Sequence, residues 1–166
     1  MYDHASFLSL MMRRPQAFAR LEGSNAYPGL NGEVYFYQTN TGVLVVTQVE
    51  GLPTSTDLCR QPVFAYHIHE GDSCGGNETD PFAGAMSHYN PNQCPHPYHA
   101  GDMPPLFGCN GSAFSAFITD RFSVGEVIGK TVIIHSAPDD FTTQPSGNSG
   151  MKIACGVIRN AATMGK

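Results

Sequence analysis

Residues 33–47, EVYFYQTNTGVLVVT, decide the fold class of this chain. The runs at 33–37 and 43–47 are rich in β-branched and aromatic side chains, which favour strands. Between them, residues 39–42 (TNTG) supply the residue types that tight hairpin turns require. The stretch therefore predicts two strands joined by a turn, and the strand pattern recurs along the chain.

Five further segments alternate apolar and polar residues or concentrate β-branched ones, as strands do. They are residues 16–22 (QAFARLE), 63–70 (VFAYHIHE), 112–119 (SAFSAFIT), 131–135 (TVIIH) and 152–158 (KIACGVI). The stretches 71–109 and 136–150 are instead rich in Gly and Pro, and long loops in compact domains are usually functional. We therefore expect an all-β sandwich or barrel with two long functional loops.

A single domain is expected over residues 16–166, after an N-terminal extension at residues 1–15. The chain of 166 residues shows no repeat, linker or low-complexity tract. Its formal net charge is −5 and no basic cluster exceeds Arg13-Arg14, which argues against a nucleic-acid partner. No apolar run reaches the ~18 residues of a membrane-spanning helix, so no membrane partner is expected.

The N-terminal sequence gives an expectation for the cellular compartment of the protein. A short apolar run at 7–12 is followed by Arg13 and Arg14, whereas a secretory signal places its positive charge before a longer apolar region. This order predicts a cytoplasmic protein, or an exported one if the N-terminus is incomplete.

His67 and His69 stand two residues apart in a predicted strand. Side chains at such spacing point to the same face, so the two imidazoles can share one metal ion, while Ile68 faces the core. Taken alone, an H-x-H pair is more often a polar strand face than a metal site.

A second set of ligand types lies within one loop. His88, His96, His99 and Asp102 provide three imidazoles and one carboxylate, which suits a four-coordinate Zn²⁺ site closed to water. A loop so rich in Gly and Pro has little means of folding by burial, and a metal can supply that energy. The plainer alternative is a solvated His-rich loop.

His135 ends the apolar strand TVIIH. A lone histidine there is more often a satisfied strand-end residue than a ligand. With His67, His69 and one shared loop histidine it completes a set of four nitrogens, and imidazole ligation suits copper.

These residues belong to blocks that together resemble copper/zinc superoxide dismutase, in that family's order and over about residues 16–160. The blocks are FAYHIHE (64–70), AG (83–84), HYNP (88–91), HAGD (99–102), IGKTVIIH (128–135), DD (139–140), GNSG (147–150) and ACGVI (154–158). The resemblance implies an eight-stranded Greek-key β-barrel or flattened sandwich. Each block alone is weak, but the ordered set is highly specific.

Carried over position by position, the resemblance implies a copper site and a zinc site that share one histidine. The copper ligands are His67, His69, His88 and His135, and the zinc ligands are His88, His96, His99 and Asp102. It further implies that Asp139 hydrogen-bonds His67 and His96, which fixes ring orientation. Cys155 matches the strand cysteine of the family's disulfide, and Cys74 is its expected partner.

The implied activity is that of an enzyme, a superoxide dismutase. Copper takes an electron from one superoxide, which leaves as dioxygen, and returns it to a second, which takes two protons and leaves as hydrogen peroxide. His88 is expected to carry a proton to the substrate. Zinc does not change oxidation state, so its role is structural and electrostatic.

Lys152 departs from the family pattern, because it stands where the resemblance places an arginine that guides the anion. Lysine keeps the positive charge but loses the rigid fork of donors, so we expect superoxide to be attracted but docked less accurately. The alternative is a solvated lysine at the start of a strand. The loop after Asp140 is short and lacks the family's charged guiding segment, which predicts a weak salt dependence of the rate.

Other readings stay open at this stage. One is a copper/zinc-binding protein on the same barrel with little or no turnover, and another is a zinc-stabilised β-sandwich used for adhesion or assembly. Among the remaining cysteines, Cys94 can pair with Cys109, Cys59 can pair with either, or the thiols can stay reduced. A homodimer is compatible with the sequence.

Overall fold

The computed structural model describes residue 9 and residues 12–163, and its regular secondary structure is almost entirely β-strand. Most of the expected N-terminal extension, residues 1–15, lies outside this described part. The strands are β1 (Ala17–Gly23), β2 (Asn31–Gln38), β3 (Val43–Glu50), β4 (Val63–Phe64), β5 (Tyr66–His69), β6 (Leu106–Phe107), β7 (Ser112–Thr119), β8 (Thr131–His135), β9 (Lys152–Val157) and β10 (Arg159–Asn160).

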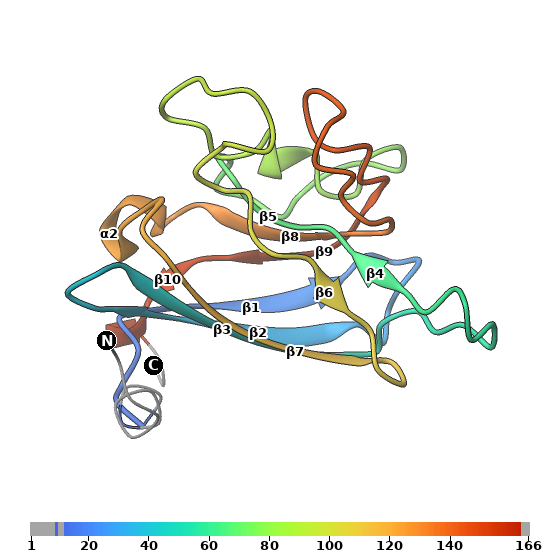
Figure 1. Cartoon of the computed structure of the whole chain (residues 1–166), viewed down its shortest axis with the longest axis horizontal. Helices are drawn as coiled ribbons and strands as arrows, with labels where there is room; N and C mark the ends of the chain where they lie inside the picture. Colours follow the sequence, from blue (N-terminus) through green and yellow to red (C-terminus); the bar gives the residue numbers. More distant parts are fainter. Residues whose placement is uncertain (1–8, 10–11, 164–166) are drawn as a thin grey trace.

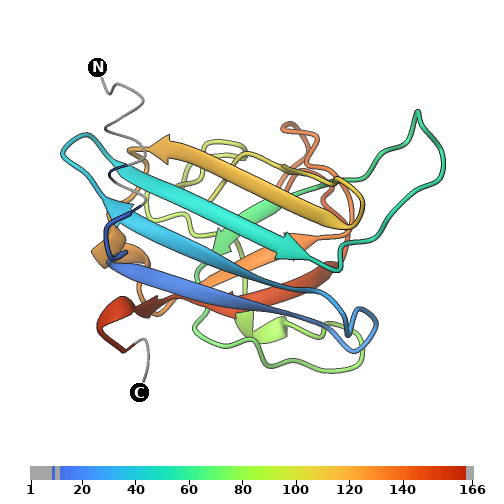
Figure 2. The ribbon, with the colours of Figure 1, turned by 90° about the horizontal axis from the view of Figure 1, so that it is seen from below.

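Eight of these strands form one curled antiparallel sheet in the order β5-β8-β9-β1-β2-β3-β7, with β10 pairing beside β1. Figure 1 shows β5, β8 and β9 in an upper layer and β1, β2, β3 and β7 in a lower one. The same curvature is visible from below in Figure 2. The remaining strands, β4 and β6, pair with each other. This arrangement confirms the all-β fold.

All seven predicted strands are present. The hairpin at residues 33–47 is confirmed, and Gln38 pairs with Val43 at its turn. The predicted strand at 63–70 is divided at Ala65, whose N–H donates to the Ala137 carbonyl 2.9 Å away instead of continuing the ladder. That bond ties the strand to the loop at residues 136–150.

The sequence did not predict the two-residue strands β6 and β10 or the short helices. These helices are η1 (Ala83–Ala85), α2 (Val124–Val127) and η2 (Ala161–Thr163). Each is too short to leave a periodic pattern. Within the described residues, no helix is long and apolar enough to cross a membrane.

The main core lies between the two layers of the curled sheet. On β8, Val132 and Ile134 point into it, whereas Ile133 points outward. There it packs in a smaller apolar cluster with Phe82, Ala85 and Cys155. The outer face of β8 and β9 is therefore a covered surface, and the loop after β5 covers it.

A disulfide fixes that covering loop to the sheet. Cys74 and Cys155 are bonded with an S–S length of 2.06 Å, which confirms the expected pair. The bond joins residues that lie 81 positions apart, so it closes a long loop of the unfolded chain and favours the folded state. Cys59, Cys94 and Cys109 are free thiols.

Phe36 offers a test of the main core. Its side chain is 0% exposed and meets Phe122 edge-on, with ring centroids 6.4 Å apart. We expect Phe36→Ala to lower the free energy of unfolding by about 3–5 kcal/mol, because it leaves a cavity. Urea denaturation of the metal-free protein measures the change. The control, Gln48→Ala on an exposed position of β3, should change it by less than about 0.5 kcal/mol, and a similar small loss for Phe36→Ala would contradict this assignment of the core.

Candidate metal centre

The outer face of β5 carries two buried histidines. Tyr66 and Ile68 point into the main core, so His67 and His69 point the other way, as the spacing predicted. Both are covered by the loops above the sheet, with exposed fractions of 0% and 2%. Imidazoles buried on the outside of a sheet require partners for their nitrogens.

His135 joins this pair from the end of β8. Its Nε2 lies 3.3 Å from Nε2 of His69. The Nδ1 of His69 donates to the Met86 carbonyl at 2.8 Å, and the Nδ1 of His135 faces the Gly150 carbonyl at 3.4 Å. Each ring therefore holds its proton on Nδ1, and the two Nε2 lone pairs face each other. Such an arrangement favours a cation between them.

His67 and His88 complete a set of four, which we call the tetra-histidine group (His67, His69, His88 and His135). Their ligand atoms all lie within 4.8 Å of one another. The Nε2 of His67 donates to Asp139 at 2.8 Å, so its Nδ1 carries a lone pair. That Nδ1 and the Nε2 of His88 are both buried without a hydrogen-bond partner. Two buried nitrogens without a hydrogen-bond partner, in a group this close together, fit a set of metal ligands.

His88 also belongs to a second set, the histidine–aspartate group (His88, His96, His99 and Asp102), whose ligand atoms meet the same 4.8 Å limit. The Nδ1 of His88 lies 2.8 Å from Asp102, and the Nδ1 of His96 lies 3.0 Å from it. The Nδ1 of His96 nevertheless makes no hydrogen bond. Close approach without hydrogen-bond alignment is the geometry of ligands aimed at a common ion.

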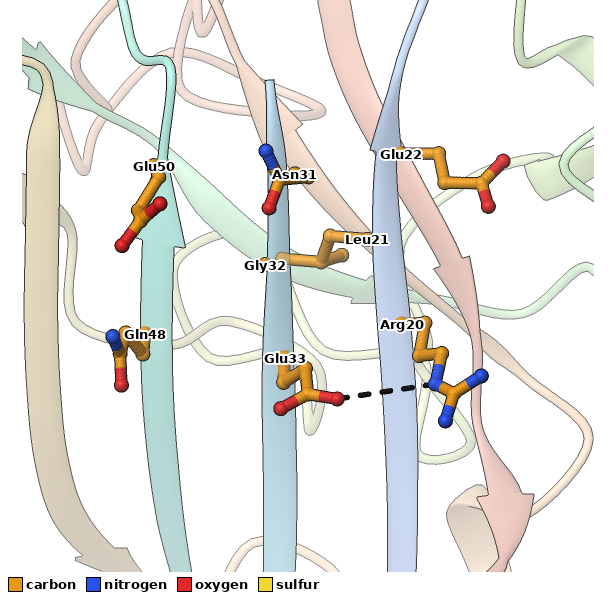
Figure 3. A pocket seen from close by; sticks show the side chains of 8 residues that line it. All are labelled: Arg20, Leu21, Glu22, Asn31, Gly32, Glu33, Gln48 and Glu50. Carbon is orange, nitrogen blue, oxygen red and sulfur yellow. Dashed lines mark ion pairs between the residues drawn. The ribbon is translucent and has the colours of Figure 1, made fainter. Parts of the chain in front are cut away.

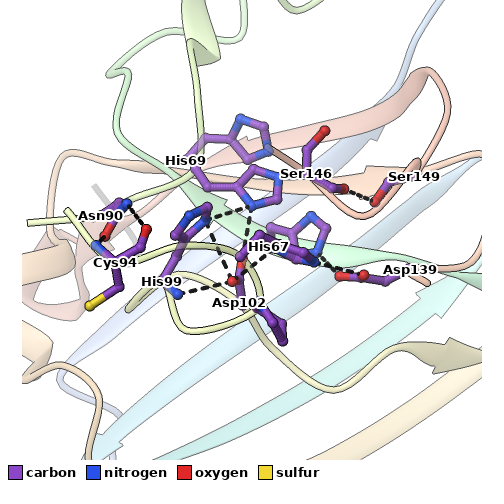
Figure 4. A network of polar contacts seen from close by, with 12 residues as sticks. His67, His69, Asn90, Cys94, His99, Asp102, Asp139, Ser146 and Ser149 are labelled. Atoms are coloured by element: carbon purple, nitrogen blue, oxygen red, sulfur yellow. Dashed lines mark hydrogen bonds and ion pairs between the residues drawn. The ribbon is translucent and has the colours of Figure 1, made fainter. Parts of the chain in front are cut away.

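Asp139 connects the two groups. Its carboxylate accepts from Nε2 of His67 at 2.8 Å and from Nε2 of His96 at 2.9 Å, and Figure 4 shows it beside His67. Burial opposes its charged form, but the hydrogen bonds from both histidines dominate and hold the pKa of Asp139 well below its ordinary value. A charged Asp139 keeps both Nε2 atoms protonated and leaves both Nδ1 atoms free.

Burial also keeps His67, His69 and His135 neutral. It lowers the pKa of His67 and of His69, and it lowers the pKa of His135 to about 3. Neighbouring histidines add to this effect. Neutral imidazoles have the lone pairs that metal binding requires.

The carboxylate of the histidine–aspartate group is charged. Burial disfavours its ionised form, but the hydrogen bond from His88 and the electrostatic influence of the three surrounding histidines outweigh burial and lower the pKa of Asp102. Three imidazoles and one anionic oxygen form a donor set that suits Zn²⁺.

Several supports of these loops were not predicted from the sequence. Gln144 brackets His96, because its Oε1 accepts from the His96 N–H at 2.9 Å and its Nε2 donates to the His96 carbonyl at 2.7 Å. Gly147 has a φ of 69°, and a Cβ there would lie 2.0 Å from Asp139. Asn90 braces the loop through Cys94, as Figure 4 shows. Only the loop geometry identifies these contacts.

Arg121 is a further support of the loop that carries His96 and His99. It follows β7, and its Nη1 donates to the carbonyls of Pro97, His99 and Asp102 at 3.1, 3.2 and 3.3 Å. A single guanidinium thus holds the loop that carries the histidine–aspartate group. Nothing in the local sequence pattern distinguishes Arg121 from a solvated arginine.

Lys152 is not a free cation. Its Nζ lies 2.8 Å from the Asp80 carboxylate and donates to the Phe82 carbonyl at 3.1 Å. Its side chain is 15% exposed, so it is not the solvated strand-start lysine that was the alternative. Lys152 pairs with His135 across β8 and β9, which places it beside the tetra-histidine group.

A polar hollow lies away from the two histidine-rich groups, on the outer face of β1, β2 and β3. Figure 3 shows Glu22, Glu33, Glu50 and Arg20 around it. Arg20 and Glu33 form an exposed ion pair of 3.8 Å. None of these acidic groups joins a cluster with metal-ligand geometry among the described residues, so the two histidine-rich groups remain the candidate site.

Comparisons with known proteins point to one family. The family model for copper/zinc superoxide dismutase (SODC) matches residues 30–158. The chain is 34% identical to copper–zinc superoxide dismutase 2 of Aquifex aeolicus over 143 residues, which cover 77% of this chain and 78% of that protein.

Relatives in other bacteria show similar agreement. Over 136 residues the chain is 32% identical to the copper–zinc superoxide dismutase of Legionella pneumophila, covering 77% of each protein. It is 30% identical to that of Photobacterium leiognathi over 142 residues, which cover 77% of this chain and 78% of that one.

The contacts of Arg121 predict that this side chain slows the release of metal from the histidine–aspartate group. We expect Arg121→Met to release added Zn²⁺ on the order of tenfold faster, since partners outside the ligand set typically change metal affinity by that factor or more. Transfer of Zn²⁺ to a coloured chelator measures the rate. Arg60→Met is the matched control, because Arg60 is exposed and pairs only with Asp57 among the ion pairs found. Equal release from both variants would contradict the role of Arg121.

Proposed function

Because this chain belongs to the copper/zinc superoxide dismutase family, we propose that its tetra-histidine group binds copper and its histidine–aspartate group binds zinc. The protein is then an enzyme that converts superoxide to dioxygen and hydrogen peroxide. The observation that carries this proposal is His88, which belongs to both ligand groups. Its Nδ1 lies 2.8 Å from Asp102, and its Nε2 is buried without a hydrogen-bond partner. With both metals bound, His88 would be the residue that the copper group and the zinc group have in common.

The ligand types support the assignment of the two metals. Four imidazole nitrogens suit copper, which accepts nitrogen ligands and can change oxidation state. Three imidazoles and a carboxylate suit zinc in a closed four-coordinate site. The reading as a zinc-stabilised adhesion domain would leave the tetra-histidine group without a purpose, and so it is not favoured.

When bound, copper supplies the one-electron chemistry that takes an electron from one superoxide and gives it to the next. The chain's own part is to hold the nitrogens in place and to handle protons. His88 Nε2 is the atom suited to the second task, because it is buried and has no hydrogen-bond partner in the protein. A nitrogen so placed can take up a proton and present it to a reduced oxygen species.

The neighbouring groups keep this geometry fixed. Asp139 holds the rings of His67 and His96 through two hydrogen bonds, and the Met86 carbonyl holds His69. Each bond fixes one ring proton, so each free nitrogen points at its metal position without reorganisation. Lys152 supplies the positive charge that attracts a small anion toward the copper position.

Metal analysis combined with a superoxide assay tests the proposed function. We expect one copper and one zinc per chain and a catalytic rate of superoxide loss that disappears when copper is removed. Bound copper and zinc without rate enhancement would refute the enzyme and favour the metal-binding alternative. His135→Ala is the matched variant, since it removes a ligand of the tetra-histidine group only and should lose copper while keeping zinc.

Lys152→Ala tests the cation beside the copper position. We expect kcat/KM for superoxide to fall on the order of tenfold, because local charge raises the encounter rate of a small anion. Copper content should stay unchanged, since Lys152 belongs to neither ligand group. An unchanged rate would show that Lys152 does not attract the substrate.

Compartment, assembly and domain limits complete the proposal. The N-terminal sequence favours a cytoplasmic location. The disulfide Cys74–Cys155 favours an oxidising compartment instead, because disulfides persist mainly in such compartments. Cell fractionation decides between the two compartments.

The functional domain is residues 16–166, and it acts on superoxide without nucleic-acid or membrane partners. A homodimer is the expected assembly, and sedimentation measures it.

A further inference from the structure

We propose that Asp80 is a positioning residue that holds Lys152 and offsets its charge beside the copper position, so that Asp80 limits how strongly the site attracts its anionic substrate. This inference rests on the proposed function. It concerns a residue in the loop between β5 and η1 that no sequence motif distinguishes.

The first support is the contact itself. The Asp80 carboxylate lies 2.8 Å from Nζ of Lys152, and the side chains are 40% and 15% exposed. The lysine is thus the more enclosed partner. Its Nζ also donates to the Phe82 carbonyl at 3.1 Å. Two oxygen partners fix the ammonium group in one place, whereas a free lysine would sweep through solvent.

The second support is the position of the pair. His135 and Lys152 face each other across the antiparallel strands β8 and β9, and residues in such register share a face of the sheet. The ion pair therefore lies within electrostatic reach of the tetra-histidine group.

The third support is that the loop holds Asp80 in advance. The Asp80 N–H donates to the Asn77 side chain at 2.9 Å, and the Asn77 N–H donates to the Asp80 carbonyl at 2.9 Å. The other carboxylate oxygen accepts from the Phe82 N–H at 3.0 Å. The disulfide at Cys74 ties the same loop to β9. Asp80 is consequently a fixed charge and not a chance surface contact.

The physical consequence concerns charge at the approach to copper. A carboxylate 2.8 Å from an ammonium group cancels most of its field at longer range. An anion arriving from solvent then meets a dipole in place of a free positive charge. This predicts a weak dependence of the rate on ionic strength even though Lys152 is present.

Asp80→Asn tests the inference, because asparagine keeps an oxygen for the Phe82 N–H and removes the charge. With the copper- and zinc-loaded protein we expect kcat/KM to rise on the order of threefold at low ionic strength and to fall more steeply as salt is added. The kcat should be unchanged. Azide, a small monovalent anion, should bind the copper more tightly by a similar factor in a titration followed by visible absorption.

Glu78→Gln is the matched control. Glu78 lies two residues away in the same loop and is exposed, so the variant loses the same charge without freeing Lys152. Its kcat/KM and azide affinity should match those of the unaltered protein. An equal effect in both variants would show a general charge effect and overturn the inference. So would an unchanged azide affinity in Asp80→Asn.

The double variant Asp80→Asn/Lys152→Ala separates the two residues. If Asp80 acts through Lys152, the gain from Asp80→Asn disappears in the Lys152→Ala background; a gain that persists there would overturn the inference. A copper-loaded protein without dismutase turnover would refute the proposed function alone, because the azide titration still decides the role of Asp80.

Discussion

The two hydrogen bonds that Asp139 accepts, from His67 and His96, are the constraint on which the metal centre depends. They join β5, the loop between η1 and β6 that carries His96, and the loop between β8 and β9 that carries Asp139. They also decide chemistry, because each places a ring proton on Nε2 and frees Nδ1. Without Asp139 the two rings would have no fixed tautomer, and both ligand groups would lose a defined nitrogen.

The sheet and the loops contribute differently to this centre. The sheet supplies rigidity through its own core, and it fixes His67, His69 and His135 by strand register. The loops have little core of their own and are held by a disulfide, by Arg121 and by Gln144. Burial makes unpaired nitrogens costly, so a loop that brings three imidazoles together is stable when a metal completes them. Folding of the loops and metal binding are thus coupled.

The sequence was sufficient for the strands and for the grouping of the candidate ligands, and the reason is local. Strand periodicity places His67 and His69 on one face whatever the rest of the chain does, and the hairpin at residues 33–47 depends on neighbouring residues alone. The ordered blocks of the resemblance then supplied Asp139 and the pair Cys74–Cys155. The contacts of Arg121 and Asp80 could not be predicted, because each depends on where a long loop without periodic structure lies.

Lys152 shows how a substitution can be understood only with its surroundings. Read from the sequence, a lysine at this position weakens docking because it lacks a planar fork of donors. In the structure its Nζ is fixed by Asp80 and the Phe82 carbonyl, so the ion pair restores part of the rigidity that an arginine would bring by itself. The same pair reduces the net charge at the copper approach. Positional accuracy and long-range attraction are therefore set against each other at this residue, and Asp80 determines the balance between them.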